Sequence, residues 1–253
     1  MKIDDHIVLR YLRGQSLDEE KDCWIFKWEN KNVFEYPDEI HRQWVSKLHY
    51  KLTEQVKNYV PRNLKTVQLL FPDFENIMKK FNIMFVVGFP DPYDAMVLER
   101  NGKSFVVFDL IQFGKETLSE EYSCHRVLTH ELIHICLHNR YPSPENPSYL
   151  EDLSYKAFDE GFAHALTFAD NITQFQFDKF LEEKFRDARE MMRRALVESD
   201  TAKQEVFRKR ADTGNYWDKF ASICGKLYLL KHKDRLCDIY SNGWRNFAEK
   251  IVL

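Results

Sequence analysis

The sequence predicts an α+β protein that is mostly helical and has one small antiparallel sheet. Three short apolar runs rich in Val, Ile and Phe lie between residues 83 and 110, and such runs are typical of strands. On both sides of them the apolar residues recur at helical spacing. The 253 residues are 44% hydrophobic, enough for a sizeable core, and include only eight Gly and eight Pro, which argues against a disordered chain.

A first helix is expected after an irregular, Trp-containing start. The segment 36–39 reads Tyr-Pro-Asp-Glu, and Pro in the first turn with acidic residues at the positive end of the dipole favours a helix start there. The helix continues to about residue 59 and ends before Pro61. A second helix is expected at residues 64–80. The apolar stripe of the first helix repeats every four residues, at Ile40, Trp44, Leu48, Leu52 and Val56.

Three strands are expected at residues 83–87, 95–98 and 105–110. The first is an uninterrupted apolar run, as in a buried strand. The second and third are joined by Arg100-Asn101-Gly102-Lys103, and Asn-Gly between two apolar runs predicts a tight hairpin.

The rest of the chain is expected to be helical. One helix starts at Ser119, whose hydroxyl can cap it, and ends before a proline-rich loop at residues 139–148. Acidic and basic residues alternate along residues 179–210, which favours a solvated helix face. We expect an N-terminal helical region at residues 1–81, packed on the core, and a second domain at residues 82–253. Further helices are expected at residues 150–169, 175–209, 216–231 and 233–252.

Charge and cysteine content narrow the class of protein. The net charge is −3 and the pI is near 6.3, so no positive field attracts nucleic acid or an anionic membrane. The first twenty residues lack the apolar segment of a signal peptide, and no run of eighteen apolar residues occurs. The five cysteines are scattered, as reduced thiols are. We therefore expect a cytoplasmic protein with no nucleic-acid or membrane partner.

The motif His130-Glu131-Leu132-Ile133-His134 predicts a metal site on a helix. Histidines four residues apart project from nearly the same side of a helix, with about 6 Å of axial rise between them, so both imidazoles can bind one zinc ion. Glu131 follows the first histidine and can take a proton from a zinc-activated water without binding the metal. The motif therefore predicts two ligands and a general base.

Two other arrangements of a third ligand do not fit the residues after the motif. His138 lies about 12 Å along the helix axis from His130, too far to share an ion with it. The metzincin arrangement needs Gly at position 137 and His at position 140, where this chain has Leu137 and Arg140. The third ligand must therefore come from elsewhere.

Glu160 is the favoured third ligand. It follows the proline-rich loop, on a helix that can run back antiparallel to the motif helix. The small residues Ala157, Gly161 and Ala163 allow close contact between helices, and a Gly in mid-helix costs about 1 kcal/mol relative to Ala, so it calls for such a reason. His164 lies one turn beyond Glu160 and is the alternative, as a ligand or as a donor to a developing oxygen anion.

A helical His-Glu-x-x-His followed by a Glu on the next helix resembles the zincin peptidases of the gluzincin type. The resemblance implies a zincin-like fold with the sheet packed on the motif helix, His130, His134 and Glu160 as zinc ligands, and Glu131 as the base. Residues 150–166 also resemble uncharacterised bacterial zinc-dependent proteases with a Glu-Gly-aliphatic-Ala segment. The specific similarity covers roughly residues 105–166.

The resemblance also raises expectations about the surroundings of the metal. The gluzincin Asp four residues after the ligating Glu corresponds to His164, so Asp159 or Asp152 must orient a histidine instead. Tyr155, His164 and Tyr216 are candidate donors to the oxygen anion, with ordinary packing as the alternative for each. Residues 105–110 match the zincin edge strand that binds substrate, or form an ordinary core strand.

These observations together predict a zinc-dependent metallopeptidase acting on a peptide or protein. Zinc activates the water, Glu131 is the general base, and His164 and Tyr216 are the further catalytic candidates. One alternative is a regulatory protease of the ImmA/IrrE type, since HELIHICLH resembles its motif helix. The other is a non-catalytic, zincin-derived binding module.

Overall fold

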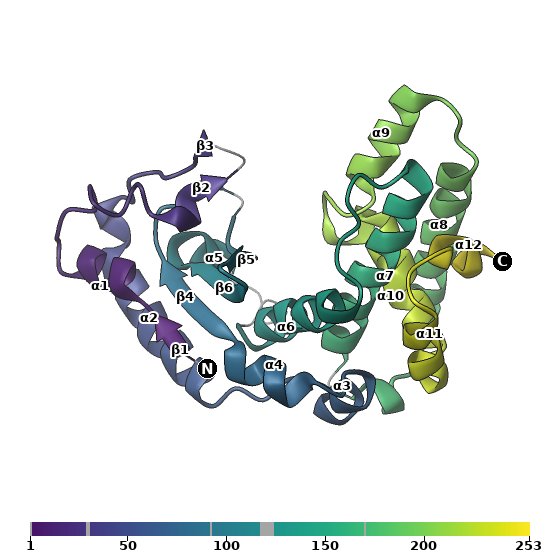
Figure 1. Ribbon diagram of the computed structural model, residues 1–253, viewed down its shortest axis with the longest axis horizontal. Helices are drawn as coiled ribbons and strands as arrows, with labels where there is room; N and C mark the ends of the chain where they lie inside the picture. The colour runs from purple at the N-terminus through teal and green to yellow at the C-terminus, as the bar shows by residue number, and fades with distance from the viewer. Residues whose placement is uncertain (1, 29–30, 92, 117–123, 170) are drawn as a thin grey trace. The chain divides into compact units, whose positions relative to one another are not determined.

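The computed structural model describes residues 2–28, 31–91, 93–116, 124–169 and 171–253 (Figure 1). Most of this chain is helical, and its strands form one four-stranded sheet and one two-stranded sheet, which confirms the α+β class. Two compact units are present: Met1–Val60 with Glu75–Glu131, and Pro61–Phe74 with Leu132–Leu253. The domain boundary expected between residues 81 and 82 stays a prediction.

The four-stranded sheet of the first unit is mixed, so the antiparallel sheet expected from the sequence is wrong in part. Its order is β1-β4-β6-β5; β4 pairs in parallel with both β1 and β6, and only β5 and β6 are antiparallel. Strand β4 is buried along nearly its whole length, as parallel strands usually are. The four strands are β1 (Lys2–Asp4), β4 (Asn82–Val86), β5 (Ala95–Arg100) and β6 (Lys103–Asp109).

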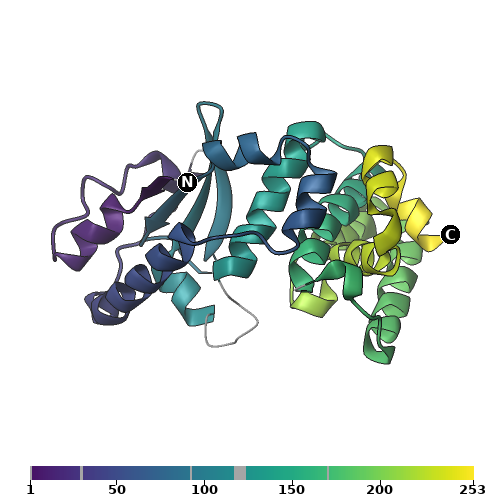
Figure 2. The same cartoon turned by 90° about the horizontal axis from the view of Figure 1, so that it is seen from below.

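The hairpin between β5 and β6 is confirmed. Arg100 pairs with Lys103, and the two residues between them, Asn101 and Gly102, have φ of 51° and 68°. Positive φ at both positions is the type I′ turn that Asn-Gly favours. Figure 2 shows the strands of this sheet from a second direction. Because β6 lies inside the sheet, between β4 and β5, it is the ordinary core strand of the two alternatives and not the edge strand.

Helices α1 (His6–Leu12), α2 (Arg42–Lys57) and α5 (Leu110–Glu116) accompany this sheet in the first unit. Of the expected stripe on α2, Leu52 and Val56 are buried. Ile40 is 75% exposed because it precedes α2 in the 3-10 turn Glu39–His41. The first unit also contains the two-stranded sheet of β2 (Lys27–Trp28) and β3 (Lys31–Asn32).

Asp109 ties the end of β6 to the segment after β4. Its Oδ2 accepts hydrogen bonds from the backbone N–H of Gly88 at 2.7 Å and of Phe89 at 2.8 Å. Its Oδ1 accepts from Ile111 at 2.8 Å and Gln112 at 3.0 Å, in the first turn of α5. Burial raises the pKa of Asp109 to about 6, although the four N–H groups oppose this shift.

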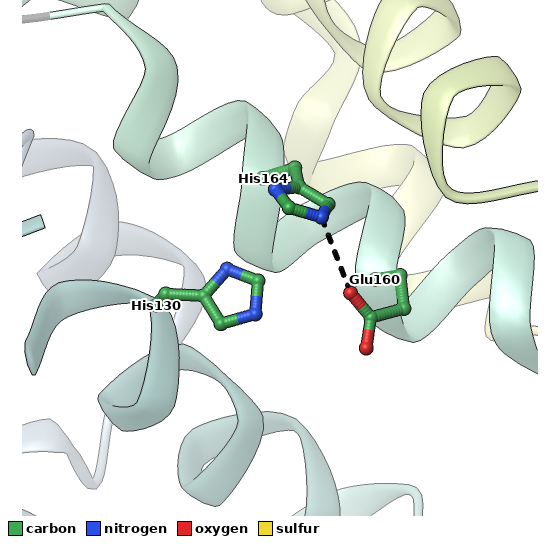
Figure 3. A group of neighbouring side chains, drawn as sticks. All are labelled: His130, Glu160 and His164. Atoms are coloured by element: carbon green, nitrogen blue, oxygen red, sulfur yellow. Dashed lines mark ion pairs between the residues drawn. The ribbon is translucent and has the colours of Figure 1, made fainter. Parts of the chain in front are cut away.

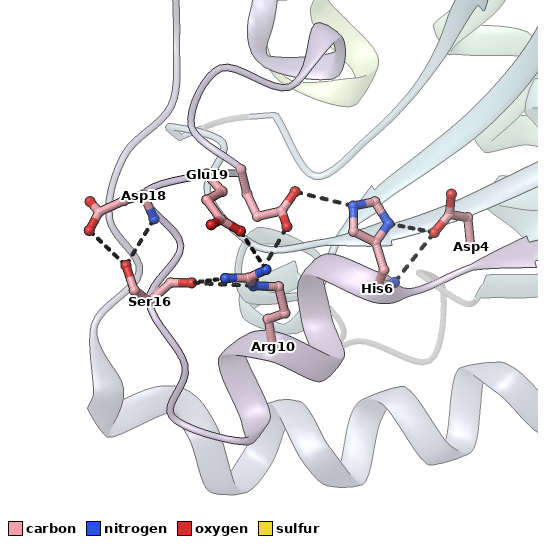
Figure 4. A network of polar contacts seen from close by, with 7 residues as sticks. Asp4, His6, Arg10, Ser16, Asp18 and Glu19 are labelled. Carbon is pink, nitrogen blue, oxygen red and sulfur yellow. Dashed lines mark hydrogen bonds and ion pairs between the residues drawn. The ribbon is translucent and has the colours of Figure 1, made fainter.

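A second polar network holds the N-terminal segment together near the surface (Figure 4). His6 lies between two carboxylates, with Nδ1 2.6 Å from Asp4 Oδ1 and Nε2 3.2 Å from Glu20 Oε2. Arg10 pairs with Glu19 at 2.9 Å. Partial burial lowers the pKa of His6, but Asp4 and Glu20 together raise it above its ordinary value.

The second unit is helical throughout its described residues, and several expected helices are divided. The helix expected at residues 64–80 is two helices, because Pro72 interrupts it. The one expected at residues 175–209 breaks at 197–200, where Asp200 caps the next helix through Lys203 N–H at 3.0 Å. The one expected at residues 233–252 breaks at Gly243, which has a φ of 71°.

The helices of the second unit have the following bounds. Helix α4 is given with them, although it belongs to the first unit from Glu75 onwards. They are α3 (Leu64–Leu70), α4 (Phe74–Lys80), α7 (Tyr149–Phe168), α8 (Lys179–Leu196), α9 (Thr201–Arg210), α10 (Phe220–Lys231), α11 (Leu236–Asn242) and α12 (Phe247–Val252). The 3-10 turn Tyr216–Asp218 precedes α10.

Helix α7 is close to its expected bounds and packs on α10 at very short range. Ser148 and Glu151 form a capping box that starts α7. A Cβ on Gly225 of α10 would lie 1.8 Å from the carbonyl oxygen of Ala157, and a Cβ on Gly161 would lie 2.9 Å from the Gly225 backbone. The small residues of α7 therefore serve contact with α10, whereas the sequence suggested contact with the motif helix.

Three other expectations concern residues around the motif helix, the cysteines and the membrane. Ser119 lies outside the described residues, and α6 is described from Cys124 to Arg140. All five cysteines are free thiols. In the part of the chain that the structure describes, no helix has the length and apolar character needed to cross a membrane.

Candidate metal centre

Helix α6 (Cys124–Arg140) presents the two motif histidines. Leu128, Leu132 and Ile133 are fully buried and fix which side of α6 faces inward. His130 is half-buried and His134 is 8% exposed, so neither imidazole lies on an open helix surface. Buried imidazole nitrogens need partners, and for His134 these come from α7.

Glu160 of α7 lies between His134 and His164. His134 Nε2 is 3.6 Å from Glu160 Oε1, and His164 Nε2 is 3.4 Å from Glu160 Oε2. Two ligand atoms that share a tetrahedral zinc at 2.0–2.1 Å lie about 3.4 Å apart. Each separation therefore suits a pair of ligand atoms on one metal ion, and imidazole nitrogens with a carboxylate are a donor set that zinc prefers.

His130 joins Glu160 and His164 in one of two groups, among the described residues, that could hold a metal ion. The ligand atoms of these three residues all lie within 4.8 Å of one another (Figure 3). The sequence predicted His130, His134 and Glu160 as ligands and His164 as the alternative. In the structure His164 takes the place of His134 in this group, and His134 approaches Glu160 from outside it at 3.6 Å.

Asp159 lies beside His134. His134 Nδ1 lies 3.0 Å from Asp159 Oδ2, which leaves Nε2 directed at Glu160. A carboxylate on the far nitrogen of a metal-binding histidine fixes the ring and increases its basicity. The sequence left Asp159 and Asp152 as alternatives for this role. Asp152 instead lies 3.5 Å from the ammonium of Lys156, so Asp159 is the residue that contacts the histidine.

His138 reaches the same carboxylate from the next turn of α6. Its Nε2 lies 3.1 Å from Oδ1 and 3.2 Å from Oδ2 of Asp159. His134, His138 and Asp159 form the second group whose ligand atoms lie within 4.8 Å of one another. Burial by itself raises the pKa of Asp159, but His134 and His138 hold it well below its usual range. Asp159 is therefore an anion bound by two imidazoles.

The pKa values of Glu160 and His164 shift in opposite directions. Burial raises the pKa of Glu160, although His134 opposes the shift. Burial, followed by the positive charges of Lys226 and Lys219, holds the pKa of His164 well below its usual value. A neutral imidazole has a free electron pair for a metal ion, so this shift keeps His164 competent as a ligand at neutral pH.

Glu131 and Tyr216 are the remaining residues singled out by the sequence. Glu131 is half-buried on α6, next to His130. Tyr216 stands in the turn before α10, and its ring meets that of His164 edge-on at 5.4 Å. Tyr155 lies beside the other group, because its ring stacks on His138 at 6.3 Å between centroids, and its hydroxyl donates to the carbonyl of Tyr141 at 3.3 Å. Glu131, His164 and Tyr216 keep their catalytic roles as predictions.

One residue of this region was missed in the sequence. Lys226 of α10 is fully buried, and its ammonium donates a hydrogen bond to the Tyr216 hydroxyl at 2.8 Å. A single lysine among the apolar residues of 220–230 was the available signal, since helices seldom bury a lysine completely.

Comparisons with models of protein families, with curated proteins and with solved structures found no match to this chain. The assignment of a function therefore depends on the residues of the site.

Proposed function

We propose that this chain is a zinc-dependent metallopeptidase of the gluzincin type, with a zincin-like arrangement of helices α6 and α7. The observation that carries the proposal is the position of His134 between two carboxylates. Its Nδ1 lies 3.0 Å from Asp159 and its Nε2 3.6 Å from Glu160. An imidazole oriented by one carboxylate toward another potential ligand is the usual arrangement of a zinc-binding histidine.

In this proposal His130, His134 and Glu160 hold the zinc ion, and Asp159 fixes the orientation of His134. When bound, zinc polarises the substrate carbonyl and lowers the pKa of a water molecule. Glu131 takes the proton from that water and delivers it to the leaving amine, so one carboxylate serves as base and then as acid. Peptide bonds are the substrate class, and their rate of hydrolysis depends on this proton transfer.

His164 and Tyr216 are the proposed donors to the oxygen anion that develops on the substrate carbonyl. Both carry groups able to donate a hydrogen bond, and their rings are in contact. Donors that are already in place when this charge develops stabilise the transition state more than the ground state. Neither residue needs to move a proton for this role.

A second candidate function rests on the crowding around Glu160. If His130, His134, Glu160 and His164 all bind one ion, the tetrahedral shell is closed, and closed shells are typical of structural zinc. The chain would then be a zincin-derived binding module. An added hydroxamate binds at an open zinc site but not at a closed one, so hydroxamate affinity separates the two functions.

Glu131→Gln tests the proposed peptidase most directly. The variant keeps the size of the side chain but removes its proton-accepting oxygen, so we expect it to bind one zinc ion and to lose at least about 100-fold in kcat. Cleavage of a proteome-derived peptide library, read by mass spectrometry, gives the activity, and elemental analysis gives the zinc content. Equal cleavage by both proteins would overturn the role of Glu131.

Glu183→Gln is the matched control for this experiment. Glu183 is an exposed glutamate on α8, and its substitution makes the same chemical change outside the proposed site. We expect both its zinc content and its cleavage products to equal those of the unsubstituted protein. A loss of activity in this control as well would point to a general effect of the substitution.

A further inference from the structure

Lys226 is a fully buried charged residue, and the rings that surround it come from segments other than α10. Its side chain is 0% exposed, and Nζ lies 3.2 Å from the ring centroid of Phe168 and 4.9 Å from those of Tyr216 and Trp217. Taking an ammonium out of water is costly, and aromatic faces together with hydrogen bonds offset that cost. The three rings therefore form a cage around one charged group.

The cage fixes the direction of one hydrogen bond. Lys226 Nζ is 2.8 Å from the Tyr216 hydroxyl oxygen, and an ammonium can only donate. The Tyr216 oxygen is thus the acceptor, and its own proton points away from Lys226. An acceptor bond from a cation also polarises the phenol and makes its O–H a stronger donor.

The same tyrosine is held against the candidate metal centre. Its ring meets that of His164 at 5.4 Å and 90°, and His164 Nε2 lies 3.4 Å from Glu160 Oε2. A chain of contacts therefore runs from Lys226 through Tyr216 and His164 to Glu160. A lysine sealed at 0% exposure cannot contact a substrate itself, and it meets this chain of contacts at the Tyr216 hydroxyl.

We propose that Lys226 is a positioning residue that holds the Tyr216 hydroxyl as an acceptor and so directs the phenol proton toward the oxygen anion formed on the substrate. This proposal rests on the proposed hydrolytic function, because it assigns Tyr216 a task in that reaction. It adds a residue that touches neither metal nor substrate. Without the ammonium, the phenol can rotate its O–H to other acceptors, and the donor is no longer in place when charge develops.

A double-mutant cycle of Lys226→Met and Tyr216→Phe tests the coupling. Methionine keeps much of the length of lysine without its charge, and phenylalanine keeps the ring of Tyr216 without its hydroxyl. We expect Tyr216→Phe to lower kcat by about 100-fold and Lys226→Met by about 10-fold, with little change in KM. In the double variant we expect the kcat of Tyr216→Phe alone, since Lys226 then has no hydroxyl to position.

Two further variants separate positioning from packing. Lys226→Gln retains a hydrogen-bond donor without the charge, so we expect its kcat to lie between those of the unsubstituted protein and Lys226→Met. It also replaces Lys226→Met if that protein does not fold. Leu227→Ala removes a fully buried side chain from the same helix, and we expect it to lower the urea midpoint of unfolding but leave kcat per folded molecule unchanged.

Binding of inorganic phosphate to the zinc-loaded protein provides a readout that requires no turnover. Phosphate is a tetrahedral anion that can bind the metal and accept from Tyr216. We expect Lys226→Met to weaken phosphate by about 10-fold when Tyr216 is present and by less than about twofold in the Tyr216→Phe protein. Calorimetric titration measures both affinities.

The outcomes separate this proposal from the proposed function. If Lys226→Met lowers kcat and phosphate affinity equally in the Tyr216 protein and in the Tyr216→Phe protein, the positioning role is overturned. The role is also overturned if Lys226→Met lowers neither quantity. If Glu131→Gln keeps full activity, the peptidase proposal fails, and phosphate affinity alone then decides whether Lys226 acts through Tyr216.

Discussion

Two buried carboxylates, one in each unit, are stabilised in opposite ways. Asp109 of the first unit is 1% exposed and accepts hydrogen bonds only from backbone N–H groups, four in all. Asp159 of the second unit is 8% exposed and is bound by the imidazoles of His134 and His138. The pKa of Asp109 is raised to about 6, whereas that of Asp159 lies well below its usual range.

The difference shows what kind of neighbour compensates for burial. Backbone N–H groups are dipoles and offset only part of the lost hydration, whereas imidazoles near a carboxylate can take up a full positive charge. The backbone contacts of Asp109 hold β6, the segment after β4 and α5 together. The contacts of Asp159 are side chains that can bind metal, which makes this carboxylate part of the candidate metal centre.

Asp109→Asn should produce the largest change in stability. An Asn carboxamide presents an NH2 group to two backbone N–H donors that previously bonded to an oxygen, so both are left unsatisfied in the interior. We expect the free energy of unfolding at pH 7 to fall by about 2–4 kcal/mol, with zinc affinity unchanged. Urea unfolding and a zinc titration measure the two quantities. A loss below about 0.5 kcal/mol would show that the carboxylate is not the tie between these segments.

Asp159→Asn should change metal binding instead. Removing the carboxylate from His134 loosens the ring that presents Nε2, and we expect zinc affinity to fall by about 10- to 100-fold. Competition with a chromophoric chelator measures this affinity. Asp152→Asn is the matched control, because Asp152 lies on the same helix but contacts Lys156. If both variants bind zinc as tightly as the unsubstituted protein, Asp159 does not orient a metal ligand.

The pH dependence of the free energy of unfolding gives a further test of how Asp109 differs from Asp159. Its pKa is raised from 3.8 to about 6 on folding, so the folded state binds a proton more tightly than the unfolded state. This contribution to stability is full below pH 3.8 and is lost as pH rises through about 6. We therefore expect the stability deficit of Asp109→Asn to be larger at pH 4 than at pH 7. A deficit that narrows toward pH 4 would mean that the four N–H groups outweigh burial.

His6 should give the smallest effect, because its side chain is 48% exposed and solvent screens its partners. The pKa of His6 is raised from 6.5, so its contribution is full below pH 6.5 and is lost as pH rises through the raised value. We expect His6→Gln to reduce stability by less than about 1 kcal/mol at pH 6 and by less at pH 8. Urea unfolding at both pH values checks this; a larger deficit at pH 8 would contradict it.

Local patterns in the sequence predicted those parts of the fold that depend on local physics. The Asn101-Gly102 turn needs positive φ at two positions, which Asn and Gly tolerate, and α7 is close to the bounds that helical spacing indicated. The break before α9 was missed although Asp200 is a favourable N-cap, because acidic and basic residues continue to alternate on both sides of it. Parallel pairing of β1 with β4 was not predictable, since these strands lie far apart in the sequence.

The sequence predicted which residue types form the candidate metal centre, but it did not predict which of them are in contact. Spacing alone identified His130 and His134 on α6. The choice between Asp159 and Asp152 depended on which face of α7 meets His134, and that face is set by contact with α10. Lys226 was missed because its role comes from rings contributed by two other segments.

The close contact between α7 and α10 at Gly225 restricts which side chains the protein tolerates next to Lys226. A side chain at Gly225 would lie 1.8 Å from the Ala157 carbonyl oxygen, so every residue other than Gly requires the helices to separate. Lys226 is the next residue, and the depth of its ammonium is therefore set by two backbones in contact. In a library of random variants, substitutions at Gly225 should be depleted as strongly as those at the proposed zinc ligands, although Gly225 carries no chemical group of its own.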